Sequence, residues 1–419
     1  MRRTIAASAA ALACAVSLLA GVAGASAGPP SGPAQSSFLA ATPYMGWDTY
    51  FALPGGFPET KILQEADRLK QTGLEADGYR LIWLDSGWWQ GQRDAAGNMV
   101  VSPTQWPHGI AWLAATLHAN GFELGVYSDA GATGCGVKGG MYGHYQQDIN
   151  TLAAWGVDAV KVDWCGGAAQ ALTPAVQYAQ IHQAILHDTP RRAMLLNICV
   201  FLQPGQGPTA PAFNLSAFNS YTFGPSNGNS WRTNTDAGVP GNVPFSSVLR
   251  NLDADATQNG AAGPGHWNDP DYLGPDQGMT SAQFKTQFTM WAMLAAPLMI
   301  SDDMLTMSSS SLGIVSNRAV IAIDQDPAGI QGWLVGGSVS GNGEAFEKPL
   351  SDGSYAIALL NRGSTAQTVS TSTAAALIGT AASYHVLNVW TGARSNTTGA
   401  LTATVQPYST VLLRVSLAK

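Results

Sequence analysis

The residue types best suited to catalysis stand together in residues 161–165, which contain Lys161, Asp163 and Cys165. They follow residues 157–160, a short apolar run with β-branched residues that predicts a buried strand. A lysine and an aspartate at the mouth of such a strand are costly unless they are paired or solvated. We therefore interpret Asp163 as a reacting carboxylate.

Two other predicted strands also end in an acid. Residues 79–85 end in Asp85 and residues 123–129 end in Asp129, just as the next strand ends in Asp163. Apolar residues at helical spacing between and around these strands predict helices over residues 59–72, 110–120, 148–155 and 174–187. Thr173 is placed to cap the last of these helices.

Strands and helices that alternate at this rhythm predict a parallel sheet. No glycine-rich phosphate loop follows the first strand, which favours a closed α/β barrel over an open doubly wound sheet. In such a barrel the chemistry lies at the C-terminal ends of the strands, where the three acids stand.

The sequence changes character near residue 327. Beyond it, residues 355–360, 383–389 and 409–415 read as strands separated by turns, which predicts a small antiparallel β-domain. This part holds no cluster of acids, so we expect it to have a packing or accessory role.

The composition narrows the classes of partner. The chain has 419 residues, 11% of them charged, and a formal net charge of −7. An acidic chain without a stripe of lysine and arginine argues against binding nucleic acid or an anionic membrane. No stretch beyond the N-terminal segment reaches the roughly 18 apolar residues that a membrane span needs.

The N-terminal segment has the features of an export signal. Arg2 and Arg3 precede an apolar core rich in small residues, and residues 25–27 fit a small-x-small cleavage site. The two arginines also permit a twin-arginine route. We expect residues 1–27 to be removed, residues 28–38 to be a disordered lead-in, and the mature protein to be secreted.

Removal of that segment leaves Cys135, Cys165 and Cys199. An odd number in an exported protein means that at least one thiol is free or pairs between chains. No CxxC or HxxxH spacing accompanies these cysteines, so structural zinc is not expected.

At this point the chain resembles glycoside hydrolase family 27, the family of α-galactosidases and α-N-acetylgalactosaminidases. The resemblance covers nearly all of the mature chain and rests on short motifs in family order: PYMGW at 43–47, WPHG at 106–109, SDAG at 128–131, KVDWC at 161–165, WNDPD at 267–271, WAMLAAPL at 291–298 and DQDP at 324–327. It implies a (β/α)8 TIM barrel over residues 39–327, an antiparallel β-sandwich over residues 328–419, and retaining hydrolysis of an α-glycoside.

The resemblance also implies catalytic roles. Retaining hydrolysis uses a nucleophile and an acid that then serves as base, about 5–5.5 Å apart. By motif Asp163 is the nucleophile, with Lys161 as a cation that keeps it ionised, and Asp236 of the Arg232-x-x-x-Asp236 pattern is the acid/base. The plainer alternatives are a structural ion pair between Asp163 and Lys161, and a turn-capping role for Asp236.

Other residues are candidates for sugar contact. Asp85 and Asp129 suit sugar or network contacts better than catalysis, and Trp47 either lines the sugar face or plugs the barrel. Asp271 is expected to hold a sugar hydroxyl or Arg232. The complete set expected to bind substrate is Trp47, Asp48, Asp85, Ser86, Asp129, Lys161, Val200, Arg232 and Asp271.

The resemblance pairs Cys135 with Cys165 in a disulfide that staples neighbouring barrel loops. The family's partner for Cys199 would stand where this chain has Gly228, so Cys199 is expected to be a free, buried thiol.

Three departures fall on sugar contacts. Ser86 replaces the second of two adjacent aspartates, Cys199-Val200-Phe201 replaces a Cys-Glu-Trp run, and Val162 replaces an aromatic residue before the nucleophile. A site that hydrogen-bonds a hydroxyl discriminates strongly, whereas an apolar replacement does not. These changes put galactose itself in question.

Three functions therefore remain open. The first is an α-galactosidase-like enzyme, and the second is a relative with another sugar specificity, of the isomalto-dextranase or β-L-arabinopyranosidase type. The third, of another class, is a non-catalytic carbohydrate-binding barrel. The expected partner is an oligo- or polysaccharide, no metal or organic cofactor is implied, and the oligomeric state is left open.

Overall fold

The computed structural model describes residues 39–54, 56–200, 219–337 and 341–418. These residues belong to one compact unit, which extends from Ser37 to Lys419. The expected export signal, residues 1–27, and the expected lead-in, residues 28–38, lie outside the described residues. None of the helices in the described part of the chain has the length and apolar character that a membrane crossing requires.

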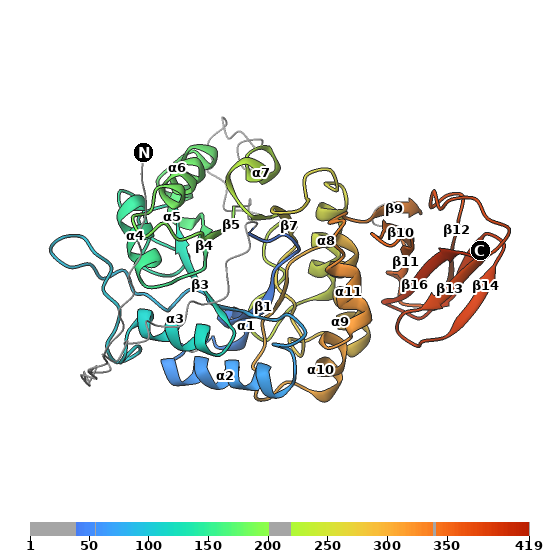
Figure 1. Ribbon diagram of the computed structural model, residues 1–419, viewed down its shortest axis with the longest axis horizontal. Coiled ribbons are helices and arrows are strands. Elements are labelled where there is room, and N and C mark those ends of the chain that lie inside the picture. The colour runs from blue at the N-terminus through green and yellow to red at the C-terminus, as the bar shows by residue number, and fades with distance from the viewer. Residues whose placement is uncertain (1–38, 55, 201–218, 338–340, 419) are drawn as a thin grey trace, which may run out of the picture. The chain divides into compact units, whose positions relative to one another are not determined.

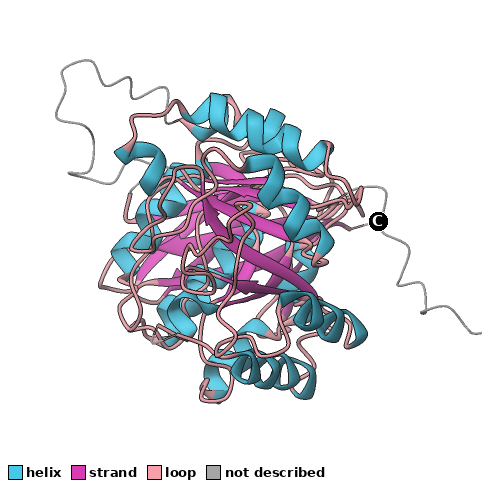
Figure 2. Ribbon diagram, turned by 90° about the vertical axis from the view of Figure 1, so that its left-hand side faces the viewer, coloured by secondary structure: helices cyan, strands magenta, loops and turns pink. Residues whose placement is uncertain are grey.

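Short parallel strands form the centre of the N-terminal part (Figure 2). They pair in the order β7-β6-β5-β4-β3-β2-β1-β8, and Leu273, just after β7, forms a parallel bridge with Ile300 of β8 that brings the two edges together. The predicted (β/α)8 barrel is thus confirmed. The strands are β1 (Met45–Asp48), β2 (Leu81–Leu84), β3 (Glu123–Asp129), β4 (Ala159–Asp163), β5 (Leu195–Ile198), β6 (Ser230–Arg232), β7 (Trp267–Asp269) and β8 (Leu298–Ile300).

Helices surround the sheet (Figures 1 and 2), and the amphipathic ones bury an apolar stripe. In α2, for example, Ile62, Ala66 and Leu69 recur at helical spacing and are buried. The helices of this part are α1 (Thr49–Ala52), α2 (Glu59–Gln71), α3 (Ile110–Ala119), α4 (Tyr145–Ala154), α5 (Cys165–Ala169), α6 (Pro174–Leu186), α7 (Gly224–Asn227), α8 (Phe245–Ala256), α9 (Ser281–Leu294), α10 (Ser309–Val315) and α11 (Arg318–Asp324), with a 3-10 turn η2 (Ser220–Thr222).

Two helix starts differ from the prediction. Helix α4 begins at Tyr145 and not at Asp148, which lies in the first turn as a buried partner of Arg93, with Nη1 2.6 Å from Oδ1. Thr173 is the N-cap of α6, but its side chain makes no capping hydrogen bond, so that part of the prediction is wrong. Pro174 at the first position favours the helix start instead, since its fixed φ is compatible with a helix.

The C-terminal part is an antiparallel β-sandwich, as predicted. Six strands pair in the order β14-β13-β16-β11-β10-β9, and β12 pairs with β15. Ile357, Leu359 and Val415 of the larger sheet are buried in one cluster with Val369 and Leu401 of the smaller sheet. The strands are β9 (Trp333–Gly336), β10 (Gly343–Pro349), β11 (Tyr355–Asn361), β12 (Gln367–Ser372), β13 (Tyr384–Asn388), β14 (Arg394–Thr397), β15 (Ala400–Val405) and β16 (Ser409–Leu417).

Helix α9 joins the barrel core to this sandwich. Its Phe288 is buried in the same apolar cluster as Leu412 of β16, and Thr286 Oγ1 donates to the Tyr408 carbonyl at 3.0 Å.

The strand register places the acids at one end of the barrel. Asp129 of β3 is paired in register with Asp163 of β4, and Arg232 of β6 with Asp269 of β7. Asp85 follows β2 directly. Because parallel strands end on the same side of a barrel, these side chains meet at its C-terminal face.

Candidate active site

Lys161 lies at the centre of the cluster at this face. Its ammonium Nζ is 2.7 Å from Asp85 Oδ2 and 3.0 Å from the Tyr272 hydroxyl. The rings of Tyr50, Tyr127 and Tyr272 lie 5.8, 5.8 and 4.9 Å from the same nitrogen. Such aromatic faces attract a cation that has lost its water.

The ion pair sets the charge of both of its members. Burial acts to lower the pKa of Lys161, but Asp85, Cys199 and Asp163 together outweigh it, Asp85 most of all, and the pKa is raised well above its ordinary value. Burial acts to raise the pKa of Asp85, but the charge of Lys161 and its hydrogen bond leave that pKa below its ordinary value. Lys161 and Asp85 are therefore a charged pair.

Asp163, at the end of β4, is partly buried beside these groups. Burial raises its pKa, the charge of Lys161 opposes that rise, and the charge of Asp236 adds to it. A hydrogen bond from the Cys199 thiol lowers the pKa of Asp163 again. The predicted pairing of Lys161 with Asp163 is corrected: the ion pair of Lys161 is with Asp85, and Lys161 affects Asp163 through its charge.

A second charged group, the arginine network, consists of Arg232, Asp236 and Asp271. Arg232 is buried, and its Nη2 lies 3.0 Å from Asp236 Oδ1 and 2.9 Å from Asp271 Oδ2. The carboxylate of Asp271 also accepts hydrogen bonds from the backbone N–H groups of Ala237 and Tyr272, at 2.6 and 2.8 Å. Burial raises the pKa of Asp271 to about 6, and the charge of Arg232 opposes that rise.

Asp271 adopts an unusual backbone conformation. Its φ is 93°, in the left-handed half of the map that favours glycine. Such a conformation costs about 1–3 kcal/mol and tends to persist where function requires it. Here it coincides with the bidentate role of Asp271, which binds Arg232 and two backbone amides at once.

A third group, the Asp129 cradle, is built from backbone N–H groups. Asp129 Oδ1 accepts from the amides of Gly131, Gly166 and Gly167 at 2.6, 3.2 and 3.3 Å, and Oδ2 accepts from Gly166 at 3.2 Å. The chain approaches too closely here for a side chain, since a Cβ on Gly166 would lie 1.9 Å from the Thr133 carbonyl oxygen. Both oxygens of Asp129 are therefore occupied by the protein itself.

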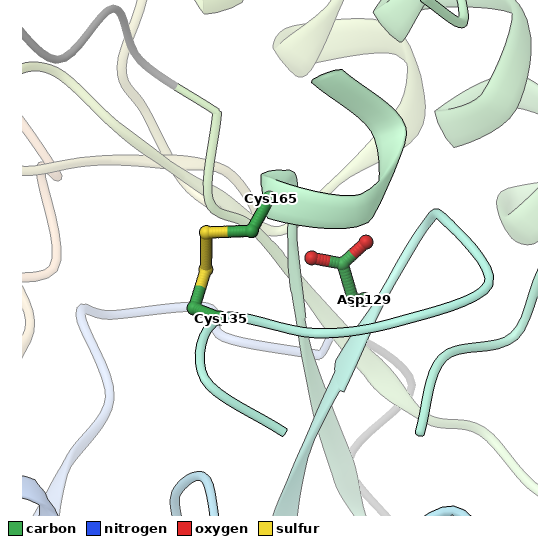
Figure 3. A group of neighbouring side chains, drawn as sticks. All are labelled: Asp129, Cys135 and Cys165. Carbon is green, nitrogen blue, oxygen red and sulfur yellow. A yellow bond between two sulfur atoms is a disulfide. The ribbon is translucent and has the colours of Figure 1, made fainter. Parts of the chain in front are cut away.

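The expected disulfide borders this cradle. Cys135 and Cys165 are bonded, which confirms that prediction, and the bond joins the loop after β3 to the first residue of α5 beside Asp129 (Figure 3). Asp129 and the two sulfurs lie close enough to form a metal-binding group, but the thiolates that a soft metal would require are consumed by the disulfide. Cys135 Sγ also lies 3.1 Å from Asp163 Oδ2, so the disulfide contacts the proposed nucleophile.

The remaining residues expected to bind substrate differ in their burial and in their hydrogen-bond partners. Trp47 is fully buried and donates from Nε1 to the Asp302 carbonyl at 2.7 Å, which fits the barrel-plug alternative better than sugar contact. Asp48 caps α1 through the Tyr50 amide, and its Oδ2 is buried with no described hydrogen-bond partner. Val200 is buried, Ser86 is partly exposed, and Phe201 lies outside the described residues.

With this geometry in place, comparison with known proteins decides the family. The profile of α-galactosidase A matches residues 56–326, and that of the α-galactosidase C-terminal β-sandwich domain matches residues 340–415. The chain belongs to glycoside hydrolase family 27. It is a glycoside hydrolase of the α-galactosidase type.

Individual relatives support the assignment to family 27. The chain is 34% identical over 397 residues to α-galactosidase A of Cellvibrio japonicus (strain Ueda107), covering 90% of this chain and 93% of that protein. It is 35% identical over 375 residues to an α-galactosidase of Oryza sativa subsp. japonica, covering 88% and 84%.

Solved structures of similar proteins have the same fold. The structure of the α-galactosidase from Saccharomyces cerevisiae with raffinose superposes with a TM-score of 0.80 at 26% identity, covering 91% of this chain and 98% of that one. A family 27 β-L-arabinopyranosidase from Geobacillus stearothermophilus superposes with a TM-score of 0.77 at 19% identity over 90% of this chain and 97% of that one, which shows a shared fold.

Two members of this family 27 site were missed from the sequence. Tyr272 binds both Lys161 and Asp85, and the only sequence signal was its place directly after the WNDPD motif. Cys199 was correctly expected to be free and buried, but its position between Asp163 and Arg232 was not foreseen. Both placements depend on which strands are neighbours in the closed barrel.

Proposed function

We propose that this glycoside hydrolase is a retaining enzyme that cleaves α-galactosides, with Asp163 as nucleophile and Asp236 as general acid and then base. One observation carries the proposal. Asp163, at the end of β4, and Asp236, just beyond β6, are electrostatic neighbours, and Lys161 and Arg232 supply a positive charge near each. Paired carboxylates of this kind are what double displacement at a sugar requires.

The chemistry follows from those positions. The Asp163 carboxylate attacks the anomeric carbon while the Asp236 carboxyl group gives its proton to the glycosidic oxygen, and the C–O bond to the leaving group breaks. A water molecule then loses its proton to Asp236 and attacks the glycosyl ester, which frees Asp163 and releases the sugar with the same anomeric configuration. Arg232 stabilises Asp236 when it is the anionic base, since Nη2 lies 3.0 Å from Oδ1.

Substrate recognition is proposed to centre on Asp85, Lys161 and Asp271, whose charged groups can bind sugar hydroxyls. Asp129 is reassigned to holding the loop after β3 and the start of α5, because its oxygens already accept backbone hydrogen bonds. Trp47 is reassigned to the barrel core. Asp48, Ser86 and Val200 remain proposed second contacts.

A second sugar specificity within the same mechanism is the alternative. Ser86 offers one hydroxyl where an acid would accept two hydrogen bonds, and the buried Val200 offers none. A glycoside with fewer or differently placed hydroxyls, such as a β-L-arabinopyranoside or an isomalto-type glucan, would suit such a site.

We also propose that the protein is exported by residues 1–27. The disulfide between Cys135 and Cys165 supports this proposal, because disulfides persist in oxidising compartments. N-terminal sequencing of the protein secreted by an expressing cell would be expected to start at Gly28. Recovery of the intact N-terminus inside the cell would contradict export.

The deciding experiment measures hydrolysis of a panel of p-nitrophenyl glycosides and isomalto-oligosaccharides by wild type and by Asp163→Asn. We expect release of α-galactose by wild type and a fall in kcat of at least about 10³-fold in the variant, since an amide cannot replace the attacking carboxylate. NMR of the first product formed should show the retained anomer. Asp67→Asn, an exposed aspartate on α2, is the matched control and should retain full activity.

Each other outcome changes a different part of the proposal. Turnover of an arabinoside or glucan alone would keep the mechanism and replace the sugar. An inverted first product would remove the nucleophilic role of Asp163. Sugar binding without turnover of any glycoside would favour a carbohydrate-binding barrel.

A further inference from the structure

Tyr272 takes part in a closed triangle of hydrogen bonds with the two charged groups proposed to bind sugar. Its hydroxyl donates to Asp85 Oδ2 at 3.0 Å and accepts from Lys161 Nζ at 3.0 Å, while Lys161 Nζ and Asp85 Oδ2 are 2.7 Å apart. All three residues are buried, with 6% of Tyr272, 6% of Lys161 and 2% of Asp85 exposed.

The triangle uses much of the hydrogen-bonding capacity of the pair. An ammonium group has three N–H donors, of which two are committed here. Asp85 Oδ2 accepts from both Lys161 and Tyr272, and Oδ1 accepts from the Ser86 amide at 2.6 Å. Little capacity is left for a sugar hydroxyl between these two charges.

A sugar hydroxyl placed between a carboxylate and an ammonium group would donate to the first and accept from the second. The Tyr272 hydroxyl makes that same pair of bonds. The protein therefore supplies, from its own chain, a hydroxyl at a position where a substrate hydroxyl would otherwise bind.

The ring is held so that it cannot easily move away. It lies edge-on to Phe51, with centroids 6.2 Å apart, and the Tyr272 amide donates to Asp271 Oδ1 at 2.8 Å. Asp271 itself is fixed by Arg232. A substrate would thus have to disturb the arginine network to displace the Tyr272 hydroxyl.

We propose that Tyr272 is a specificity-determining residue whose hydroxyl stands in for one sugar hydroxyl between Asp85 and Lys161. The site accordingly favours pyranosides that lack that hydroxyl, or tolerates its loss. This inference rests on the proposed function only in placing the sugar against Asp85 and Lys161.

The test uses Tyr272→Phe, which removes the hydroxyl and keeps the ring against Lys161. The measured quantity is the ratio of kcat/KM for p-nitrophenyl α-galactoside to that for each of its 2-, 3-, 4- and 6-deoxy analogues. We expect one of these ratios to be about 10-fold higher in the variant than in wild type, because Asp85 and Lys161 are then free to bind the hydroxyl that the analogue lacks.

Tyr127→Phe is the matched control. Its ring lies 5.8 Å from the same ammonium group, but its hydroxyl accepts a hydrogen bond from the Cys135 amide. The control should leave the ratios unchanged. If Tyr272→Phe lowers kcat/KM for all substrates by one common factor, Tyr272 only supports the fold and the inference is overturned.

A second variant and a binding measurement keep the test decisive. If Tyr272→Phe does not fold, Tyr272→Met also lacks the hydroxyl and fills the space with an adaptable side chain. If wild type turns over no galactoside, the proposed function has failed, and calorimetric Kd values for galactose and its deoxy analogues give the same ratios from binding alone. Equal ratios in wild type and variant would then overturn the inference separately.

Discussion

The Asp129 cradle and the arginine network both hold buried carboxylates at the C-terminal face of one barrel, yet they are built differently. Asp129 is bound by backbone amides of three glycines, beside a disulfide that closes a sequence separation of 30 residues. Asp236 and Asp271 share one buried guanidinium group; Asp271 also accepts two backbone N–H groups, whereas Asp236 keeps 33% of its side chain exposed. In the Asp129 cradle both carboxylate oxygens have hydrogen-bond partners from the protein, whereas the arginine network leaves the carboxylate of Asp236 accessible.

This difference distinguishes a carboxylate that stabilises the fold from one that can take part in the reaction. A carboxylate whose two oxygens both accept hydrogen bonds from backbone amides that cannot move is poorly suited to bind a substrate. A carboxylate held by a single long cation from one side still presents its other side. A strand that ends in aspartate therefore predicts that the carboxylate lies at the C-terminal face of the barrel. The groups that bind the carboxylate determine its role.

The largest expected effect comes from removing the cation of the arginine network. In Arg232→Met the carboxylates of Asp236 and Asp271 lose their shared partner, and breaking a buried pair in this way costs about 3–5 kcal/mol. Urea unfolding should show that loss in the free energy of unfolding, and kcat should fall as well, because Asp236 is no longer held.

Arg318→Met is the matched control, since Arg318 pairs with Asp77 at the surface with 79% of its side chain exposed. Its loss should change the free energy of unfolding by about 1 kcal/mol or less. Equal effects of the two substitutions would show that the arginine network is no more important to stability than a surface pair.

A smaller effect is expected from Asp129→Asn. At pH 5 the carboxyl group of Asp129 is protonated and has one O–H donor, whereas the amide has two N–H donors beside backbone N–H groups, which should lower the free energy of unfolding by about 1–2 kcal/mol. The kcat should stay within about tenfold of wild type, because we assign Asp129 to the scaffold. A loss as large as that of Asp163→Asn would contradict this assignment.

The effect of Asp129→Asn should also depend on pH. Burial, with the charge of Asp163, raises the pKa of Asp129 to about 7, above its ordinary 3.8. The folded state then holds the proton more tightly than the unfolded state, so wild type loses stability as the pH rises from 4 to 7. The variant has no titrating group at this position, so the difference in free energy of unfolding between variant and wild type should become smaller over that range. If the free energies of unfolding of wild type and variant change equally with pH, the raised pKa of Asp129 is contradicted.

Much of the barrel could be predicted because its signals are local. The predicted strand over residues 123–129 coincides with β3, and the helix predicted over residues 59–72 with α2, since apolar periodicity determines both. Strands β6, β7 and β8 have three residues each, too few for periodicity, and were implied only by family motifs.

The site was predictable where its residues share a motif. Arg232 and Asp236 stand four positions apart and do form an ion pair. The partner of Lys161 was not predictable, because Asp85 and Tyr272 are 76 and 111 residues away in the chain. The role of Asp129 was hidden for another reason: its partners are backbone amides, and the glycines that supply them do not by themselves indicate a hydrogen bond to Asp129.

The smallest expected effect concerns Cys199, which lies between the arginine network and Asp163. Its thiol hydrogen-bonds to Asp163, and Arg232 Nη1 lies 3.9 Å from its sulfur. In Cys199→Ala the bond that lowers the pKa of Asp163 is lost, so that pKa rises. Asp163 must be ionised to attack, and the acidic limb of the kcat/KM profile should therefore move to higher pH, by less than about one unit.

Cys199→Ser separates this hydrogen bond from simple packing, because the serine hydroxyl still donates. The acidic limb of the Ser variant should stay within a few tenths of a pH unit of wild type, while the plateau of both variants changes less than about threefold. If the Ser variant shifts as far as the Ala variant, the volume of the sulfur and not its proton is what matters. If neither shifts, the thiol is a bystander, and the ionisation of Asp163 depends on Lys161 alone among the groups that lower its pKa.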